Sequence, residues 1–474
     1  MNFRKWVVFT FLIHVLVVVV DKGGGLVLYL LTAHEVKQHG KSGIAASLPF
    51  ILGAVANLGL ATALVWLVRR GRYTPQVCFE TAMAVALGWG GFVAALAALV
   101  TLYVLPWWNP ELVYDPWLVL PVCATVPLLL LASYANSTQL ATERIRDYGI
   151  VHLVTSLAFL PAFFGCFFAW GGRVAVVPHG VAWGRLASTL IVVGITLWLV
   201  RKVVKLRVRV HREFLGEAVK FGWKANLTST LEYLNHRIDL SVLYALGLAT
   251  ALGGGLGKAA ADDRANEQVA FYSMAVTWAE LVWHFPEAMR DLFFSKVASS
   301  SPEQARQLTP ILARLGLLIS VLGATAVLFL IDPIMGCVTW LSGRSTGVWF
   351  EGWSPHVGAA LLVLTPGTVA YTVSKVLQAD LAARGRLPTC VWAQSLVLVS
   401  MLGLDVLWIP SHGPVGAAAA SSVAYVLGTV FTLVAYARQT ATPVSQCLFV
   451  RGSDFGYIRA ILASILSKLR GRRA

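Results

Sequence analysis

The sequence predicts an all-α polytopic membrane protein of about twelve transmembrane helices, arranged in two six-helix lobes. Of the 474 residues, 57% are hydrophobic and only 13% are charged, whereas soluble domains have roughly 45–50% and about 25%. A water-soluble globule could not bury this much apolar surface, and a disordered chain would contain many more charges. Many apolar runs reach about twenty residues, which is the length of a membrane-crossing helix and excludes the shorter alternating segments of a β-barrel.

Twelve apolar runs are long enough to be spans, and a basic stretch at 201–212 separates the first six from the last six. The runs cover residues 6–31, 43–68, 81–104, 117–138, 148–170, 182–200, 219–248, 269–294, 311–332, 356–382, 389–409 and 414–436. Their order predicts four parts: an N-terminal lobe at 1–200, a basic cytoplasmic linker at 201–218, a C-terminal lobe at 219–437 and a basic amphipathic cytoplasmic tail at 438–474.

Lys and Arg outnumber Asp and Glu by 38 to 23, which gives a net charge of +15. The basic residues gather before the first run, after every second run and in the tail, so we expect both termini to be cytoplasmic. This placement explains the charge without a nucleic acid partner. Two basic stretches, 201–209 and the tail beyond 455, are predicted to be amphipathic helices that bind anionic lipids at the inner membrane surface.

Enzyme and metal motifs are missing from the sequence. The six cysteines have no metal or redox spacing, so free thiols are expected. There is no G-x-S-x-G elbow, no P-loop lysine motif and no H-E-x-x-H. We therefore expect no catalytic residues, no cofactor and no metal site.

Ionisable residues inside predicted spans are the main functional signal, because each costs roughly 2.5–3.5 kcal/mol of insertion free energy at a helix centre. They form three clusters in this chain. The clusters comprise Asp21 and Lys22 in the first run, Glu232, His236, Arg237 and Asp239 in the run at 219–248, and Glu280, His284, Glu287, Arg290 and Asp291 in the run at 269–294.

Two of these clusters have helical spacing. Glu232, His236 and Asp239 follow one another at i, i+4 and i+7, so they share one face of a helix. The residues from Glu280 to Asp291 repeat the pattern, with a kink expected at Pro286. Three interpretations remain open: hydrogen-bonded pairs between the two helices, a water-filled cavity lined by both stripes, or a two-metal site. We favour the cavity, because the order His-x-x-acid and the adjacent arginines both disfavour a metal.

Five stretches of the chain resemble a known family. They are Leu234–Leu240, Val269–Ala275, Leu377–Ala379 with Ala383–Arg386, Ile409–Ala418 and Ala56–Ala63. Taken in their order along the chain, they resemble stretches of the Wzx-like polysaccharide transporters. These are the lipid-linked oligosaccharide flippases of the multidrug/oligosaccharidyl-lipid/polysaccharide (MOP) superfamily. The likeness extends from about residue 10 to 440. The long charged connection Gly253–Glu267 departs from the tight turn that is usual in the family.

The resemblance implies two lobes that close alternately on either side of the bacterial cytoplasmic membrane. The expected substrate is a polyprenyl-diphosphate-linked oligosaccharide, and the polysaccharide assembly machinery is a possible partner. Two alternatives stay open: a cation-coupled multidrug exporter of the same superfamily, and an integral-membrane polysaccharide polymerase or ligase. The second is disfavoured because no predicted outer loop is large enough for a catalytic domain.

For a flippase, the polar residues of the spans take three roles. Arginine holds phosphate oxygens with its planar fork. The diphosphate is assigned to Lys22, Arg237 and Arg290, the sugars to Asn57, Asn235 and Gln378, and proton or ion coupling to Asp21, Glu232, His236, Asp239, Glu280, His284 and Glu287. We also expect Glu280 and His284 to face Glu232 and His236.

Overall fold

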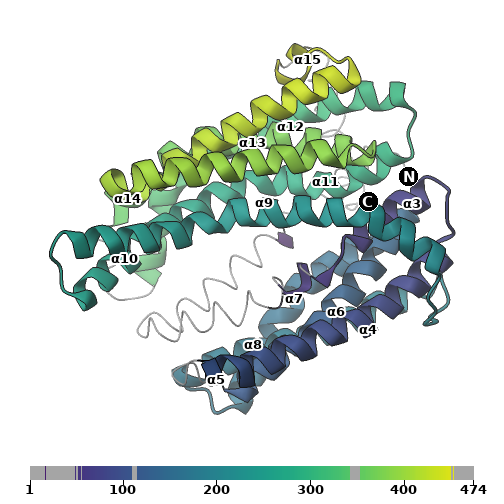
Figure 1. Cartoon of the computed structure of the whole chain (residues 1–474), viewed down its shortest axis with the longest axis horizontal. Helices are drawn as coiled ribbons and strands as arrows, with labels where there is room; N and C mark the ends of the chain where they lie inside the picture. Colours follow the sequence, from purple (N-terminus) through teal and green to yellow (C-terminus); the bar gives the residue numbers. More distant parts are fainter. Residues whose placement is uncertain are drawn as a thin grey trace, which may run out of the picture. The chain divides into compact units, whose positions relative to one another are not determined.

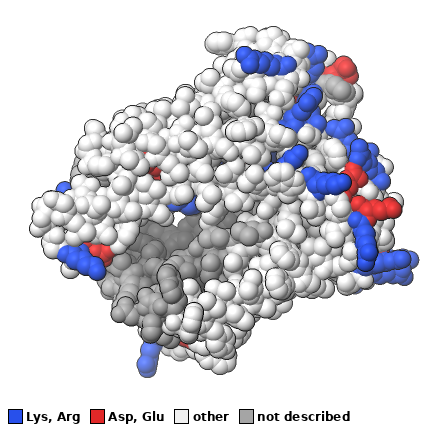
Figure 2. Space-filling model, viewed as in Figure 1, with Lys and Arg blue, Asp and Glu red and all other residues white. Residues whose placement is uncertain are grey.

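The described part of the chain is almost entirely helical (Figure 1). The computed structural model describes residues 16–17, 49, 52–54, 56–108, 115–341, 353–449 and 452. The chain divides into two compact units, Met1–Asn226 and Leu227–Ala474. Uncharged residues cover most of the face in Figure 2, as expected of a surface that contacts lipid.

Unit 1 is built from long apolar helices with short connections. Its helices are α3 (Leu60–Arg69), α4 (Pro75–Leu99), a π-helical turn (Val100–Val104), α5 (Leu105–Trp108), α6 (Pro116–Ala141), α7 (Ile145–Ala169), a 3₁₀ turn (Val174–Val176) and α8 (Val177–Val200). The start of α6 shows why the helices begin where they do. Asp115 accepts a hydrogen bond from the Trp117 N–H at 2.9 Å, and Pro116 fills the first helical position.

The linker after α8 is extended, so the predicted amphipathic helix at 201–209 is wrong. Residues 201–204 form a turn, and 205–211 have no helical structure. Apolar residues alternate with basic ones from Val204 to His211, a period of two that fits an extended chain. The Gln76 side chain donates to the Lys205 carbonyl and accepts from the Lys205 N–H, at 2.9 and 2.7 Å. These bonds attach the predicted linker to α4 within unit 1. The predicted helix in the tail lies outside the described residues.

Unit 2 contains the charged helices. After α9 (Arg212–Gly253), which runs through the boundary between the units, its elements are α10 (Lys258–Ala279), a 3₁₀ turn (Glu280–Trp283), α11 (His284–Ala298), α12 (Pro302–Leu341), α13 (Trp353–Ala383), α14 (Leu387–Thr440) and α15 (Ser445–Leu448). The long helix α14 contains two predicted spans. They join at Gly413, whose φ is 53° and ψ is −128°. Glycine adopts these backbone angles readily because it has no Cβ atom.

The predicted long connection between the spans at 219–248 and 269–294 is wrong. Helix α9 continues to Gly253 and α10 begins at Lys258, so only residues 254–257 join them. The segment is helical because it is rich in alanine and packs: Ala261 and Ala265 are fully buried, and the Tyr244 hydroxyl donates to Asp262. The two helices form the hairpin seen at the left of Figure 1.

Seven helices of the described chain are long and apolar enough to cross a membrane. They correspond to the predicted runs from 81–104 to 182–200 and from 311–332 onward, with both last runs in α14. The runs at 219–248 and 269–294 are helices with more charge. The first run lies mostly outside the described residues, and the second is described continuously only from residue 56, where it ends in the short helix α3. The count of twelve spans and the location of the termini therefore stay predictions.

Candidate functional site

A break between α10 and α11 positions the charged groups of unit 2. Pro286 has no N–H, so it cannot donate to the Val282 carbonyl one turn earlier. The chain forms a 3₁₀ turn at Glu280–Trp283, and the Val282 carbonyl accepts a bond from the Ser320 hydroxyl at 3.5 Å. The break separates Glu280 from Glu287 and lies close to the kink expected at Pro286.

Lys375 of α13 lies at the centre of the site. Its Nζ atom is 2.9 Å from the Oε1 atoms of both Glu232 on α9 and Glu287 on α11. It also lies 4.6 Å from the centre of the Trp283 ring, a cation–π contact. The residue is only 3% exposed. A lysine this deeply buried is stable only with such partners.

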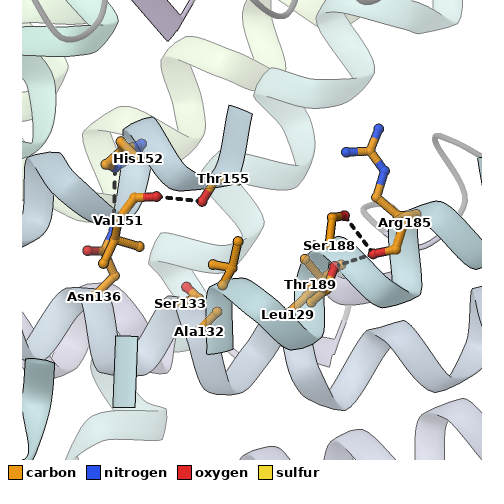
Figure 3. A pocket seen from close by; sticks show the side chains of 11 residues that line it. Leu129, Ala132, Ser133, Asn136, Val151, His152, Thr155, Arg185, Ser188 and Thr189 are labelled. Atoms are coloured by element: carbon orange, nitrogen blue, oxygen red, sulfur yellow. Dashed lines mark hydrogen bonds between the residues drawn. The ribbon is translucent and has the colours of Figure 1, made fainter. Parts of the chain in front are cut away.

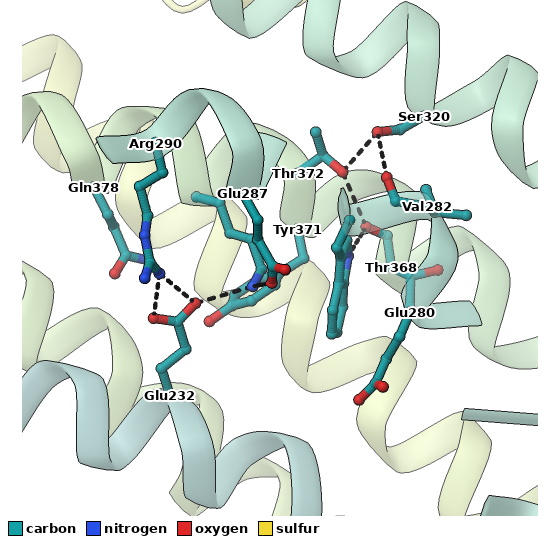
Figure 4. Close-up of polar contacts among 12 residues, drawn as sticks. Glu232, Glu280, Val282, Glu287, Arg290, Ser320, Thr368, Tyr371, Thr372 and Gln378 are labelled. Carbon is teal, nitrogen blue, oxygen red and sulfur yellow. Dashed lines mark hydrogen bonds and ion pairs between the residues drawn. The ribbon is translucent and has the colours of Figure 1, made fainter. Parts of the chain in front are cut away.

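Glu232 has a second cationic partner. Its Oε1 and Oε2 atoms accept bonds from the Arg290 guanidinium at 3.3 and 3.0 Å, and Figure 4 shows these two side chains pointing toward each other. The Arg290 side chain is 42% exposed, whereas that of Lys375 is 2% exposed. The four groups form a neutral cluster in which one cation is buried and the other is accessible.

The contacts between charged side chains of α9 and of the 280–290 segment, among the described residues, are ion pairs. Arg237 donates to Glu280 at 3.2 Å, and Arg290 donates to Glu232. The expectation that Glu280 faces Glu232 and His236 is therefore not what the described contacts show. Of the three interpretations, these contacts correspond to paired side chains. Within the described residues, no group of three His, Cys, Asp or Glu could hold a metal ion.

Two predicted sugar contacts belong to a buried amide relay. Asn235 donates to the Gln394 side-chain oxygen at 2.8 Å, and Gln394 donates to Gln378 at 3.0 Å. The Tyr371 hydroxyl donates to the same Gln394 oxygen at 2.7 Å. The relay connects α9, α13 and α14. In this arrangement both amides are engaged with protein groups, and their role in sugar binding stays a prediction.

His236 lies in an aromatic environment. Its ring centre is 4.7 Å from that of Trp283 and 6.4 Å from that of Tyr371. In the part of the chain that the structure describes, its buried Nε2 atom has no hydrogen-bond partner. The ring is therefore held by packing on this side.

Two buried aspartates of unit 2 have opposite surroundings. Asp239 accepts hydrogen bonds from the Tyr272 hydroxyl, from the Ser421 hydroxyl at 3.3 Å and from the Leu240 N–H at 2.8 Å. Asp405 on α14 is fully buried, and neither of its oxygens has a hydrogen-bond partner among the described residues. Such a group costs free energy unless a ligand or proton neutralises it.

The remaining predicted residues lie elsewhere. Asn57 belongs to unit 1, where its carbonyl accepts a bond from the Tyr134 hydroxyl at 3.0 Å and its buried Oδ1 atom has no partner within the described chain. Asp21 and Lys22 lie outside the described residues, as does the side chain of His284. Every other predicted site residue belongs to unit 2.

Lys375 and Asp405 are buried charged residues that no sequence pattern singled out. Both lie inside predicted spans, at 356–382 and 389–409, so the rule that selected Glu232 applied equally to them. Asp405 is the single charge of its run, and Lys375 shares its run only with Asp380, five residues further on. Neither belongs to a stripe at i, i+4 and i+7, and for that reason no spacing singled it out.

Comparison with solved structures gives the fold. The chain is similar to a MATE transporter in complex with MaD5, with a TM-score of 0.70 and 13% identity over 92% of this chain and 94% of that one. It is similar to a MOP superfamily transporter from Pyrococcus furiosus described as having a binding pocket of reverse polarity that suggests a different function, with a TM-score of 0.69, 12% identity and coverage of 93% and 96%. A third is an outward-facing multidrug resistance MATE transporter, with a TM-score of 0.67, 13% identity and coverage of 93% and 96%.

No protein-family model matches the chain, and no curated protein sequence resembles it significantly. At these identities the likeness establishes the fold, which is that of MOP superfamily transporters. Together with the seven apolar helices, it makes the chain a multi-pass membrane protein.

Proposed function

We propose that the chain is an alternating-access transporter that moves a polyprenyl-diphosphate-linked oligosaccharide across the bacterial cytoplasmic membrane. A diphosphate and its sugars cannot cross about 30 Å of hydrocarbon without a polar path. The observation that carries the proposal is the cluster of Lys375, Glu232, Glu287 and Arg290.

Arg290 is the exchangeable cation of this cluster. Glu232 is bound by both Lys375 and Arg290, so it keeps a cationic partner when Arg290 turns away. An arriving diphosphate offers the same acceptor geometry as the carboxylate and more negative charge. Arg290 therefore passes from Glu232 to the substrate without leaving a buried acid unpaired. Arg237, paired with Glu280 and 43% exposed, is the second candidate, and Lys22 is a third.

The multidrug exporter is the second candidate function, since a multidrug resistance MATE transporter has a similar fold. An organic cation needs an acid that is not already neutralised. Glu232, Glu280 and Glu287 each have a cationic partner, which disfavours this substrate at the cluster. Asp405, which lacks a donor among the described residues, is the observation in its favour. The Pyrococcus transporter is described as having a pocket of reverse polarity that suggests a different function. This supports choosing between the two candidate substrates by the charge of the pocket rather than by the fold.

The coupling ion is a separate question. The predicted set of Asp21, Glu232, His236, Asp239, Glu280, His284 and Glu287 stays a prediction. An interaction with the polysaccharide assembly machinery also stays a prediction.

The test measures movement of a fluorescent lipid-linked oligosaccharide in proteoliposomes, with efflux of an organic cation followed in parallel. Arg290→Ala should abolish glycan movement while the protein stays folded, because Lys375 still neutralises Glu232. Arg290→Lys should keep part of the glycan movement because it keeps the positive charge, but not all of it because lysine lacks the bidentate fork. Arg438→Ala, at the exposed end of α14, is the control. Undiminished glycan movement by Arg290→Ala, or cation efflux alone by the wild type, would overturn the proposal.

A further inference from the structure

Unit 1 contains a cavity of about 180 Å³ between α6, α7 and α8 (Figure 3). Seven of the eleven residues that line it have polar side chains, although most of the lining surface is apolar and these helices are apolar enough to span a membrane. The polar lining includes Ser133, Asn136, His152, Thr155, Ser188 and Thr189.

Three of the hydroxyl groups do not join the helices. Thr155 donates to the Val151 carbonyl at 2.8 Å, and Ser188 and Thr189 donate to the Arg185 carbonyl at 2.9 and 2.8 Å. All three bonds stay within one helix, whereas polar residues that join membrane helices bond across them. Each hydroxyl proton is engaged with the backbone, so oxygen lone pairs remain for a ligand.

Asn136 adds another acceptor. Its Nδ2 atom lies 3.4 Å from the His152 Nε2 atom. Its Oδ1 atom is buried and, within the described chain, has no hydrogen-bond partner. Arg185 adds little charge to the cavity, because its guanidinium lies 4.1 Å from the Phe159 ring centre and extends away from Ser188 and Thr189 in Figure 3. The lining therefore offers acceptors more than charge.

We propose that this cavity binds one neutral sugar ring of the substrate headgroup, an inference that rests on the proposed function. A polyol supplies hydroxyl donors for these acceptors. The volume is many times the roughly 10–15 Å³ that a single water molecule needs by the same measure, so the cavity has room for a single pyranose ring. The sugar subsite is thus in unit 1 and differs from the predicted contacts Asn57, Asn235 and Gln378.

The experiment compares two lipids on the purified protein in nanodiscs: polyprenyl diphosphate with one neutral sugar, and polyprenyl diphosphate alone. Ser133→Leu fills the cavity, and Ser137→Leu, one turn further along α6 and outside the lining, is its matched control. Ser133→Leu should weaken binding of the glycosylated lipid about tenfold, as expected for the loss of one or two hydrogen bonds. Ser137→Leu should leave it unchanged, and both variants should bind the bare lipid like the wild type.

Thr189→Val keeps the side-chain shape and removes only the hydroxyl, so it tests the site even if Ser133→Leu does not fold. It should weaken binding of the glycosylated lipid about threefold. Equal binding of both lipids by the wild type and all variants would show that the cavity holds water only and would overturn the inference. A wild type that binds neither lipid would instead refute the proposed function.

Discussion

Unit 1 and unit 2 both consist of long helices in close contact, but they place their charges differently. In the described part of unit 1, ion pairs lie near helix ends, as in Arg69–Glu143 and His179–Asp115. In unit 2, Lys375 and its acids lie inside the helix bundle. Charges at helix ends are compatible with any membrane protein, whereas charges inside a bundle are costly and indicate a functional site. The packing is alike in the two units, and the interior chemistry differs.

The largest expected effect is in the interior of unit 2. Lys375→Met leaves Glu287 without its described cationic partner, and removal of one member of a buried pair costs about 3–5 kcal/mol. We expect a large fall in the thermal midpoint of the purified protein. Adding Glu287→Gln should restore much of it, because Glu232 and Arg290 then form a neutral pair. Lys202→Met, at the exposed end of α8 beside Trp198, should have little effect. Equal midpoints for the two lysine variants would contradict the contrast between the units.

Close helix contacts should be equally sensitive in both units. A Cβ atom on Gly184 would lie 2.6 Å from the Phe163 Cα atom in unit 1, and one on Gly367 would lie 2.4 Å from the Ser422 Cα atom in unit 2. Gly184→Ala and Gly367→Ala should each destabilise by about 1–3 kcal/mol, measured as a lower midpoint. Gly194→Ala and Gly403→Ala, with open space around them, are the matched controls and should be neutral or stabilising. A tolerated Gly184→Ala would show that unit 1 packs less tightly.

Asp239 and Asp405 sharpen the comparison within unit 2. Asp239→Asn weakens hydrogen bonds from Tyr272, Ser421 and Leu240, and should cost about 1.5–3 kcal/mol. Asp405→Asn replaces a carboxyl without donors by an amide of the same shape, and should be neutral or stabilising. Both are measured as thermal midpoints. If Asp405→Asn proves the more damaging, a ligand or proton at Asp405 stabilises the protein.

The smallest expected change in stability is at the N-terminal end of α6, where Asp115 is the capping residue. Partial burial acts to raise the pKa of Asp115, but hydrogen bonds from the His179 ring and the Trp117 N–H outweigh it, so this pKa lies below its ordinary value. A lowered carboxyl pKa stabilises the fold above the ordinary Asp pKa, and this stability is lost as the pH falls through the folded value. The side chain is 45% exposed, so Asp115→Asn should cost well under about 1 kcal/mol at neutral pH. The difference from wild type should shrink as the pH falls below the ordinary Asp pKa, and a difference that persists in strong acid would reflect the cap alone.

The sequence by itself determined the class of the protein and the position of most helices. Apolar runs fix these because a lipid-exposed helix must be apolar along its whole length. The same local logic predicted the break near Pro286 and the division of the last two spans at Gly413. Local patterns gave wrong predictions for two segments, the basic linker after α8 and the charged segment after Gly253. The basic linker has a period of two and is bound by Gln76, and the charged segment after Gly253 is helical because Ala261 and Ala265 pack.

Only the tertiary structure decided which charges meet. Spacing placed Glu232 on a face of its helix, but it could not show that Lys375, 143 residues away, would reach it. Nor could it show that Asn235 and Gln378 bond through Gln394, or that α6, α7 and α8 leave a polar cavity. Periodicity describes one helix at a time, whereas a site depends on how helices pack. Packing depends on contacts far apart in the chain, such as Gly367 against Ser422, which no local pattern records.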